Sequence, residues 1–201
     1  MSLTVDYYIA PQSPWAYLGH QRFWDIAQAA GARINVLPMD LGGKVFPRTG
    51  GLPLAKRAPQ RLAYRLAELR RFSDYLKAPL NLEPAYFPVA GDDAAKLIIA
   101  VDQHDGAQAA MGIAGAVMRA VWVQQRNIAD EAVLAALLAE NDLPARRIED
   151  AHSQAAHEQY ERATLRALEA GVFGAPSYVI EGELFWGQDR LDFVERRLAQ
   201  A

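Results

Sequence analysis

The chain has 201 residues, of which 51% are hydrophobic and 22% are charged. This length and apolar content suffice for one compact core and exclude a disordered chain. The formal net charge of -3 excludes the basic field that holds a phosphate backbone, so we expect no nucleic-acid partner. The chain has no cysteine, which excludes disulfide bonds, cysteine-ligated metal centres and a thiol nucleophile of the protein's own.

The targeting signals of a secreted or membrane protein are missing from the sequence. The N-terminal residues lack a positive region followed by an apolar segment, so they do not resemble a signal peptide. The longest uncharged apolar stretch, residues 107–118, is well short of the roughly 20 residues that span a bilayer. We therefore expect a cytoplasmic protein with no membrane segment.

The N-terminal part of the chain predicts a strand, a helix and a second strand. Residues 3–9 are rich in β-branched and aromatic side chains, as in a buried strand. Ser13 and Pro14 then provide an N-cap hydroxyl and a proline at the first helical position, and apolar residues at helical spacing continue to Gly31. Residues 33–38 predict a second short strand that ends at a proline.

The middle of the chain is predicted to be helical after a punctuated segment. Residues 40–59 contain four glycines and three prolines, which indicates a functional loop or a boundary. Apolar residues at helical spacing then predict helices over residues 61–77, 93–104, 107–124, 130–140 and 151–170.

The C-terminal part predicts two more strands and a last helix. Residues 177–180 and 183–186 are joined by Glu181-Gly182, as in a hairpin, and a helix follows from Leu191. Because strands occur at both ends of the chain, the economical arrangement is one α/β sheet built from both termini, with the helical block inserted between them.

Three local motifs have both an ordinary and a functional interpretation. Ser13-Pro14 is a common helix start, but a helix N-terminus also stabilises an anion such as a thiolate. Ala175-Pro176 is typical of a turn that ends a helix, and it is also compatible with a cis peptide bond. Asp189 is a plausible first-turn carboxylate, and it is equally suited to bind the ammonium group of a ligand.

Other site classes lack their motifs. The four histidines are scattered, and His152 and His157, on one predicted helix, do not share a face at their spacing, so we expect no metal site. The sequence also contains neither a glycine-rich dinucleotide fingerprint nor the nucleophile elbow of α/β-hydrolases.

Four segments, in this order, resemble the 2-hydroxychromene-2-carboxylate isomerase family, which is related to kappa-class glutathione transferases and DsbA-like oxidoreductases. They are Asp6-Tyr7-Tyr8, Ser13-Pro14-Trp15-Ala16-Tyr17-Leu18, Gly174-Ala175-Pro176-Ser177 and Trp186-Gly187-Gln188-Asp189-Arg190-Leu191. The resemblance implies a thioredoxin-like fold with an inserted all-helical domain. The thioredoxin-like domain would comprise residues 1–41 and 152–201, and the insertion residues 42–151.

The resemblance also implies a glutathione site. Ser13 would donate a hydrogen bond to the glutathione sulfur, at the position where thiol oxidoreductases carry cysteine. A cis Ala175-Pro176 turn would offer its backbone to the glutathione cysteine. The γ-glutamyl end would lie among Trp186, Gly187, Gln188 and Asp189, with Gln188 at a position where the family has asparagine. On the substrate side, the family pattern implies roles for Lys44, Lys56 and Tyr86, and we expect Lys44, Lys56 or Arg57 to hold the substrate carboxylate.

The implied function is a glutathione-dependent cis-trans isomerase in aromatic catabolism. Its substrates would be aromatic keto-acids of the 2-hydroxychromene-2-carboxylate and trans-o-hydroxybenzylidenepyruvate type, with glutathione as a cofactor that is not consumed. The family also implies a homodimer. Two alternatives remain open: a kappa-like transferase that conjugates glutathione to electrophiles, and a redox-inactive thioredoxin-fold module that binds an extended peptide.

Overall fold

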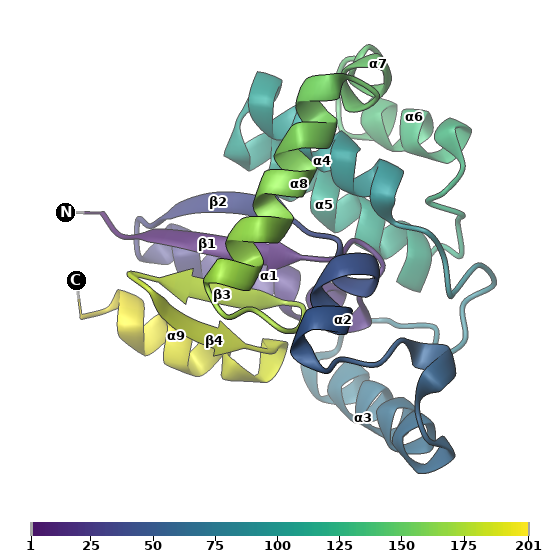
Figure 1. Cartoon of the computed structure of the whole chain (residues 1–201), viewed down its shortest axis with the longest axis vertical. Helices are drawn as coiled ribbons and strands as arrows, with labels where there is room; N and C mark the ends of the chain where they lie inside the picture. Colours follow the sequence, from purple (N-terminus) through teal and green to yellow (C-terminus); the bar gives the residue numbers. More distant parts are fainter. Residues whose placement is uncertain (1, 201) are drawn as a thin grey trace.

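The computed structural model describes residues 2–200 and contains one four-stranded sheet (Figure 1). Its order is β2-β1-β3-β4; β1 runs parallel to β2 and antiparallel to β3, and β3 is antiparallel to β4. The predicted arrangement of one sheet from both ends of the chain is therefore confirmed. The strands are β1 (Thr4–Ile9), β2 (Arg33–Pro38), β3 (Ser177–Ile180) and β4 (Glu183–Trp186).

Helices cover both faces of this sheet. Helix α8 crosses one face, while α1 and α9 lie against the other (Figure 1). No helix among residues 2–200 is long and apolar enough to cross a membrane. The α-helices are α1 (Pro14–Ala29), α2 (Phe46–Thr49), α3 (Pro59–Leu76), α4 (Asp92–Asp105), α5 (Ala107–Trp122), α6 (Glu131–Glu140), α7 (Arg147–Ala151), α8 (Gln154–Glu169) and α9 (Leu191–Leu198).

Strand β1 is buried on both sides, and its alternating side chains belong to two separate clusters. Tyr7 lies on the α1 side, where its ring is 4.6 Å from that of Phe23 and is stacked on Tyr178 at 5.4 Å. Tyr8 points to the opposite face and packs with Ala163 of α8. This alternation follows from the two-residue period of a strand and fixes β1 as the centre of the fold.

The helical block does not have a core of its own. Leu97 of α4 and Ile113 of α5 belong to the same buried cluster as Val5 of β1 and Phe23 of α1. The helices of the insertion therefore stabilise the sheet directly through shared apolar burial. The thioredoxin-like fold with inserted helices is confirmed, whereas the boundaries at residues 41/42 and 151/152 stay a prediction.

The structure corrects the helix predicted over residues 151–170. The chain forms two helices there, α7 and α8, because Ser153 has an extended backbone and caps α8 by accepting a hydrogen bond from the Ala156 amide at 3.2 Å. His152 ends α7, so it does not share a helix with His157. This interruption changes the direction of the chain, so that α8 crosses the sheet.

The punctuated segment also contains more structure than a loop. It folds into a π-helical turn over Leu41–Val45, then α2, then a 3-10 turn over Leu54–Lys56. Asp40 starts the first turn by accepting a hydrogen bond from the Gly43 amide at 2.7 Å. These short turns follow β2 and lead the chain to α3.

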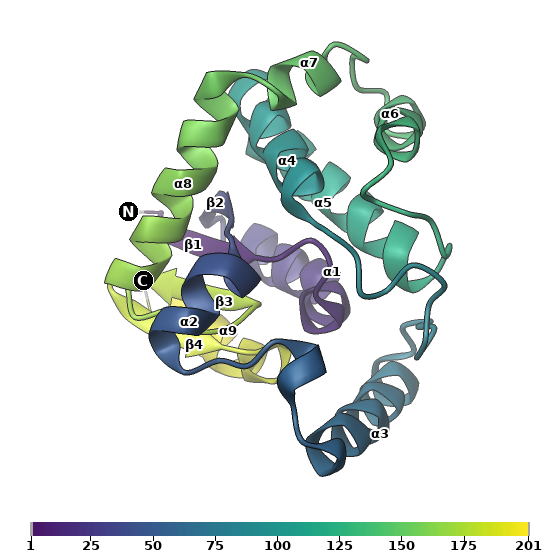
Figure 2. The same cartoon turned by 45° about the vertical axis from the view of Figure 1, so that its right-hand side comes forward.

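Helix α3 extends away from the rest of the molecule (Figure 2). The apolar residues that predicted this helix lie on one face of it, and of these only Leu69 is fully buried; they are Leu62, Leu66, Leu69, Phe72 and Leu76. One face of the helix instead lines a cavity that is described below. Apolar and cationic side chains on α3 therefore face that cavity rather than a dry core.

Gly19 allows α1 to approach the turn that follows β4. A Cβ atom at Gly19 would lie 2.7 Å from the Gln188 Cβ and 3.1 Å from the Tyr178 hydroxyl. We expect Gly19→Ala to lower the free energy of unfolding by at least about 1 kcal/mol, because overpacking outweighs the better helix propensity of alanine. Gly112→Ala is the matched control, since a Cβ there meets no atom within 4 Å. It should stabilise α5 slightly, and urea denaturation distinguishes the two results.

Candidate active site

Ser13 lies at the junction of β1 and α1, almost fully buried at 8% exposure. Its backbone is extended and its Oγ accepts a hydrogen bond from the Ala16 amide at 3.2 Å, so it is the N-cap of α1. The next residue, Pro14, has no amide hydrogen. Among residues 2–200, the Trp15 amide donates no hydrogen bond, which leaves a free donor at the positive end of the helix.

The turn before β3 faces this junction. The Ala175–Pro176 bond is cis, as the resemblance implies, and the Ser13 hydroxyl donates a long hydrogen bond of 3.4 Å to the Ala175 carbonyl. Strand pairing with β4 begins at Ser177, so the Ala175 backbone stands beyond the end of the ladder. An extended ligand can therefore pair with Ala175 beside the Ser13 hydroxyl. A second cis bond, Phe87–Pro88, was not predicted.

The segment after β4 forms a tight turn against the cis-proline turn. The Gly187 amide donates to the Pro176 carbonyl at 2.9 Å, and Gly187 has a positive φ of 102°. A Cβ at Gly187 would lie 2.5 Å from the Asp189 Oδ1. Glycine is therefore required for this conformation and for the approach of the Asp189 carboxylate.

Two polar side chains of this turn retain hydrogen-bonding capacity. Gln188 is buried and its Oε1 accepts from Arg22 at 3.1 Å, but its Nε2 has no partner within the described part of the chain. Asp189 is half exposed and accepts a hydrogen bond from its neighbour Arg190 through Oδ2 at 2.7 Å. A surface ion pair of this kind is worth little, so a ligand cation can compete for Asp189.

These elements open onto one cavity of about 1010 Å³. This volume is at the upper end of the range for small-molecule sites. One wall comes from the thioredoxin-like elements and the other from the segment that follows β2, from α3 and from the chain after α3. The lining residues on the two sides include Ser13, Trp15, Ala175, Trp186, Gly187, Gln188 and Asp189, and opposite them Phe46, Leu52, Arg57, Arg61, Arg65, Phe72, Phe87 and Val89.

The structure brings most of the sequence-predicted site residues to this cavity, but not all of them. Of the glutathione-side set, Ser13, Ala175, Trp186, Gly187, Gln188 and Asp189 line it, and Pro176 holds the turn behind them. Of the substrate-side set, only Arg57 lines it. The Lys44 ammonium binds the Glu161 carboxylate on α8 instead, while Lys56 and Tyr86 are exposed outside the lining.

Sequence reasoning missed the cavity face of α3. Arg61, Tyr64, Arg65, Glu68 and Phe72 all line the cavity, and the Phe72 ring meets the Trp15 ring edge-on at 6.1 Å. The signal in the sequence is the four-residue spacing of Arg61 and Arg65, which places both on one face of α3. The apolar residues at helical spacing predict the helix but do not indicate this face.

His20 is a core residue and does not belong to the cavity lining. Its Nδ1 is 3.1 Å from the Tyr7 hydroxyl and its Nε2 is 2.9 Å from the Met111 carbonyl oxygen. Burial lowers the pKa of His20 to about 4, so the imidazole is neutral at neutral pH. Within residues 2–200, no group of three or more histidine, aspartate or glutamate side chains is arranged to hold a metal ion.

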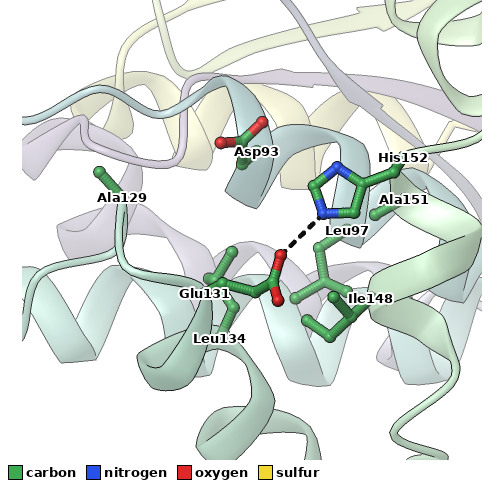
Figure 3. A pocket seen from close by; sticks show the side chains of 8 residues that line it. All are labelled: Asp93, Leu97, Ala129, Glu131, Leu134, Ile148, Ala151 and His152. Atoms are coloured by element: carbon green, nitrogen blue, oxygen red, sulfur yellow. Dashed lines mark hydrogen bonds and ion pairs between the residues drawn. The ribbon is translucent and has the colours of Figure 1, made fainter.

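A second cavity lies between α4, α6 and α7 and is too small for a substrate (Figure 3). Its volume is about 30 Å³, which leaves room for about two water molecules. The His152 Nε2 is 2.9 Å from the Glu131 Oε2 at its rim, and both side chains are more than half exposed (Figure 3). This contact links two helices and offers no enclosed reaction site.

Comparisons with known proteins agree with this geometry. Residues 4–199 match the family model described as a DSBA-like thioredoxin domain. The chain is 30% identical to the 2-hydroxychromene-2-carboxylate isomerase of Pseudomonas putida over 98% of this chain and 95% of the relative. It is 28% identical to the enzyme of that name from Sphingobium xenophagum, over 98% of this chain and 99% of the relative.

Solved structures give the same result. A structure of 2-hydroxychromene-2-carboxylate isomerase has a TM-score of 0.81 and 27% identity, covering 98% of this chain and 95% of that one. The cytosolic disulfide reductase DsbM from Pseudomonas aeruginosa, with a TM-score of 0.73, covers 99% of this chain and 100% of its own at 18% identity, which shows the fold alone. The chain therefore belongs to the 2-hydroxychromene-2-carboxylate isomerase family, within the DSBA-like thioredoxin-domain proteins.

Proposed function

We propose that this protein is a glutathione-dependent cis-trans isomerase of aromatic keto-acids of the 2-hydroxychromene-2-carboxylate type. The observation that carries the proposal is one cavity that joins Ser13 at the start of α1, the cis Ala175–Pro176 turn and Asp189, in a chain without cysteine. The names of the relatives support an isomerase, and the thiol must come from outside the chain.

The residues of this cavity fit the cysteinyl and γ-glutamyl parts of glutathione. The Ala175 backbone lies beyond the strand ladder, where an extended peptide can pair with it. The carboxylate of Asp189 suits the γ-glutamyl ammonium group. Gly174 makes room for the Trp186 indole, because a Cβ there would lie 2.2 Å from Trp186 Nε1.

The chain's own contribution to catalysis is concentrated at the start of α1. Bound glutathione supplies a thiolate for reversible addition to a conjugated double bond. The Ser13 Oγ accepts a hydrogen bond from the Ala16 amide, and its proton makes only a long 3.4 Å contact to the Ala175 carbonyl. The O–H can therefore rotate and donate this proton to the sulfur. The free Trp15 amide and the helix N-terminus favour the anionic form further. Trp15 and Phe72 exclude water from the apolar side of the cavity.

The direct test measures isomerisation of trans-o-hydroxybenzylidenepyruvate with and without glutathione. We expect turnover only with glutathione, and an unchanged glutathione concentration at the end. S-methylglutathione is the matched control, because it keeps the peptide and lacks the free thiol; it should bind and inhibit. Turnover that does not depend on glutathione, or none at all with it, contradicts the proposal.

The same site is compatible with a second activity, the conjugation of glutathione to electrophiles. The cavity is large and extends from Ser13 to α3, so it can hold a bulky electrophile beside the thiol. Product analysis separates the two activities, since conjugation consumes glutathione in proportion to product. Glutathione consumed at one equivalent per turnover would identify a transferase.

A further inference from the structure

The cavity wall opposite Ser13 carries a row of three arginines, Arg57, Arg61 and Arg65, which we call the arginine row. Arg57 precedes α3, and the other two lie on its first turns at a four-residue spacing, about 6 Å apart along the helix. The same helix face continues to Phe72 at the Trp15 end of the cavity.

Carboxylates of the protein do not neutralise the arginine row. Within residues 2–200, none of the three arginines forms an ion pair, whereas Arg190 in the same cavity is paired with Asp189. Glu68, the nearest acid along this face of α3, binds Arg71 instead. Arg57 donates only to the Leu52 carbonyl, at 2.8 Å.

Arg57 and Arg65 are partly removed from water, whereas Arg61 is exposed, and neighbouring cations of the row are close enough to repel one another. The Arg65 guanidinium lies 5.3 Å from the centre of the Phe87 ring and 5.9 Å from that of the buried Trp122. Burial, with a further contribution from Arg57, lowers the pKa of Arg65 to about 10, and burial and Arg61 lower that of Arg57. Arg57 and Arg65 stay charged at neutral pH, so an anion entering the cavity would relieve the repulsion within the row.

We propose that the arginine row binds an aromatic substrate that carries two acidic groups, with Arg61 and Arg65 determining this specificity. This inference rests on the proposed function, because it names the substrate class of that same cavity. A single carboxylate is held by one guanidinium in a bidentate pair, whereas three unpaired guanidiniums accommodate a dianion. Phe46, Phe72 and Phe87 provide the apolar contacts for the ring between them.

The substrate is a better candidate for this row than the second carboxylate of glutathione. The glutathione-side residues Ala175 and Asp189 lie on the thioredoxin-like elements, and the arginine row lies on the opposite wall with the aromatic side chains. Lys44, the basic residue that the family pattern implies for the substrate, is occupied by Glu161. The row therefore provides the unpaired cations that a substrate anion requires.

Binding of two inert probes tests the inference without any turnover. Isothermal titration would compare isophthalate, which has two carboxylates on one ring, with benzoate, which has one. We expect isophthalate to bind at least about 10-fold more tightly to the native protein, as expected for one additional charge-assisted pair. Arg61→Gln and Arg65→Gln should each lower the isophthalate affinity about 10-fold and reduce the preference for it.

Arg70→Gln is the matched control, because Arg70 is an exposed arginine of the same helix outside the cavity lining, and it should leave both affinities unchanged. Equal melting temperatures would show that the variants are folded. Equal affinities of the native protein for the two probes, or no effect of Arg61→Gln and Arg65→Gln, would overturn the inference.

Titrations in the presence of S-methylglutathione identify the source of the anion. We expect isophthalate to bind equally well when the peptide is present. Displacement of isophthalate by S-methylglutathione would assign the row to glutathione and overturn the inference about the substrate. The absence of isomerase turnover with an intact preference for isophthalate would contradict the proposed reaction alone, so the two failures are distinguishable.

Discussion

Ser13→Ala is expected to lower kcat of the glutathione-dependent isomerisation by about 10²–10³-fold, the usual cost of removing one preorganised donor to a developing anion. The hydroxyl is buried beside the Ala175 backbone, where no described side chain duplicates it. Glutathione should still bind, because the Ala175 backbone and Asp189 are unchanged. Single-turnover and steady-state kinetics measure kcat, and titration measures glutathione affinity.

A change in stability does not account for an effect of this size. Ser13→Ala also removes an N-cap, which costs about 1 kcal/mol of folding free energy and leaves most molecules folded. Ser153→Ala is the matched control: Ser153 caps α8 with the same 3.2 Å hydrogen bond to the third following amide, away from the cavity. It should lose similar stability and keep full turnover.

The ionisation of bound glutathione gives a second readout of the same variant. If Ser13 donates to the sulfur, Ser13→Ala should raise the pKa of the bound thiol, and ultraviolet absorbance of the thiolate reports this as a function of pH. A variant with native kcat and an unchanged thiol pKa would remove Ser13 from the mechanism. The positive end of the α1 dipole and the Trp15 amide would then stabilise the thiolate alone.

The order of elements could be predicted because it is a local property of the sequence. Residues 33–38 and the hairpin at residues 177–186 match the observed strands, since β-branched composition and the Glu181-Gly182 turn define them without tertiary contacts. The prediction of one continuous helix over residues 151–170 was wrong, because Ser153 acts as an N-cap and divides this segment into two helices. The sequence signal for such an interruption is weak, because the segments on both sides of it have helical periodicity.

The site residues that belong to recognisable local motifs could be predicted from the sequence. Those that reach the site only through the tertiary fold could not. Ser13, Ala175 and Asp189 come from three segments that the family pattern identifies, and all three line one cavity. The arginine row depends on where α3 is placed. Its apolar residues predicted the helix, and only the three-dimensional arrangement shows that Arg61 and Arg65 line the same cavity as Ser13.

The second substitution with a large expected effect is at Asp189, which we propose binds glutathione. Asp189→Asn is expected to weaken glutathione binding about 10–100-fold, which corresponds to the roughly 1.5–3 kcal/mol of a hydrogen bond to a charged group. The variant keeps the side-chain size and the tight approach to Gly187, so the turn should persist. Asp192→Asn, in the first turn of α9 and outside the cavity lining, is the matched control and should bind glutathione normally.

A glutathione analogue without the γ-glutamyl amino group identifies the partner of Asp189. The native protein should bind this analogue about as weakly as Asp189→Asn binds glutathione, and the variant should no longer distinguish the two ligands, because the removed charges belong to one pair. If instead the variant also binds the analogue more weakly than it binds glutathione, the two losses of affinity are independent. Asp189 would then act elsewhere, for example by holding Arg190 and the turn in place. The comparison thus separates direct contact with the ammonium group from an effect on the conformation of the turn.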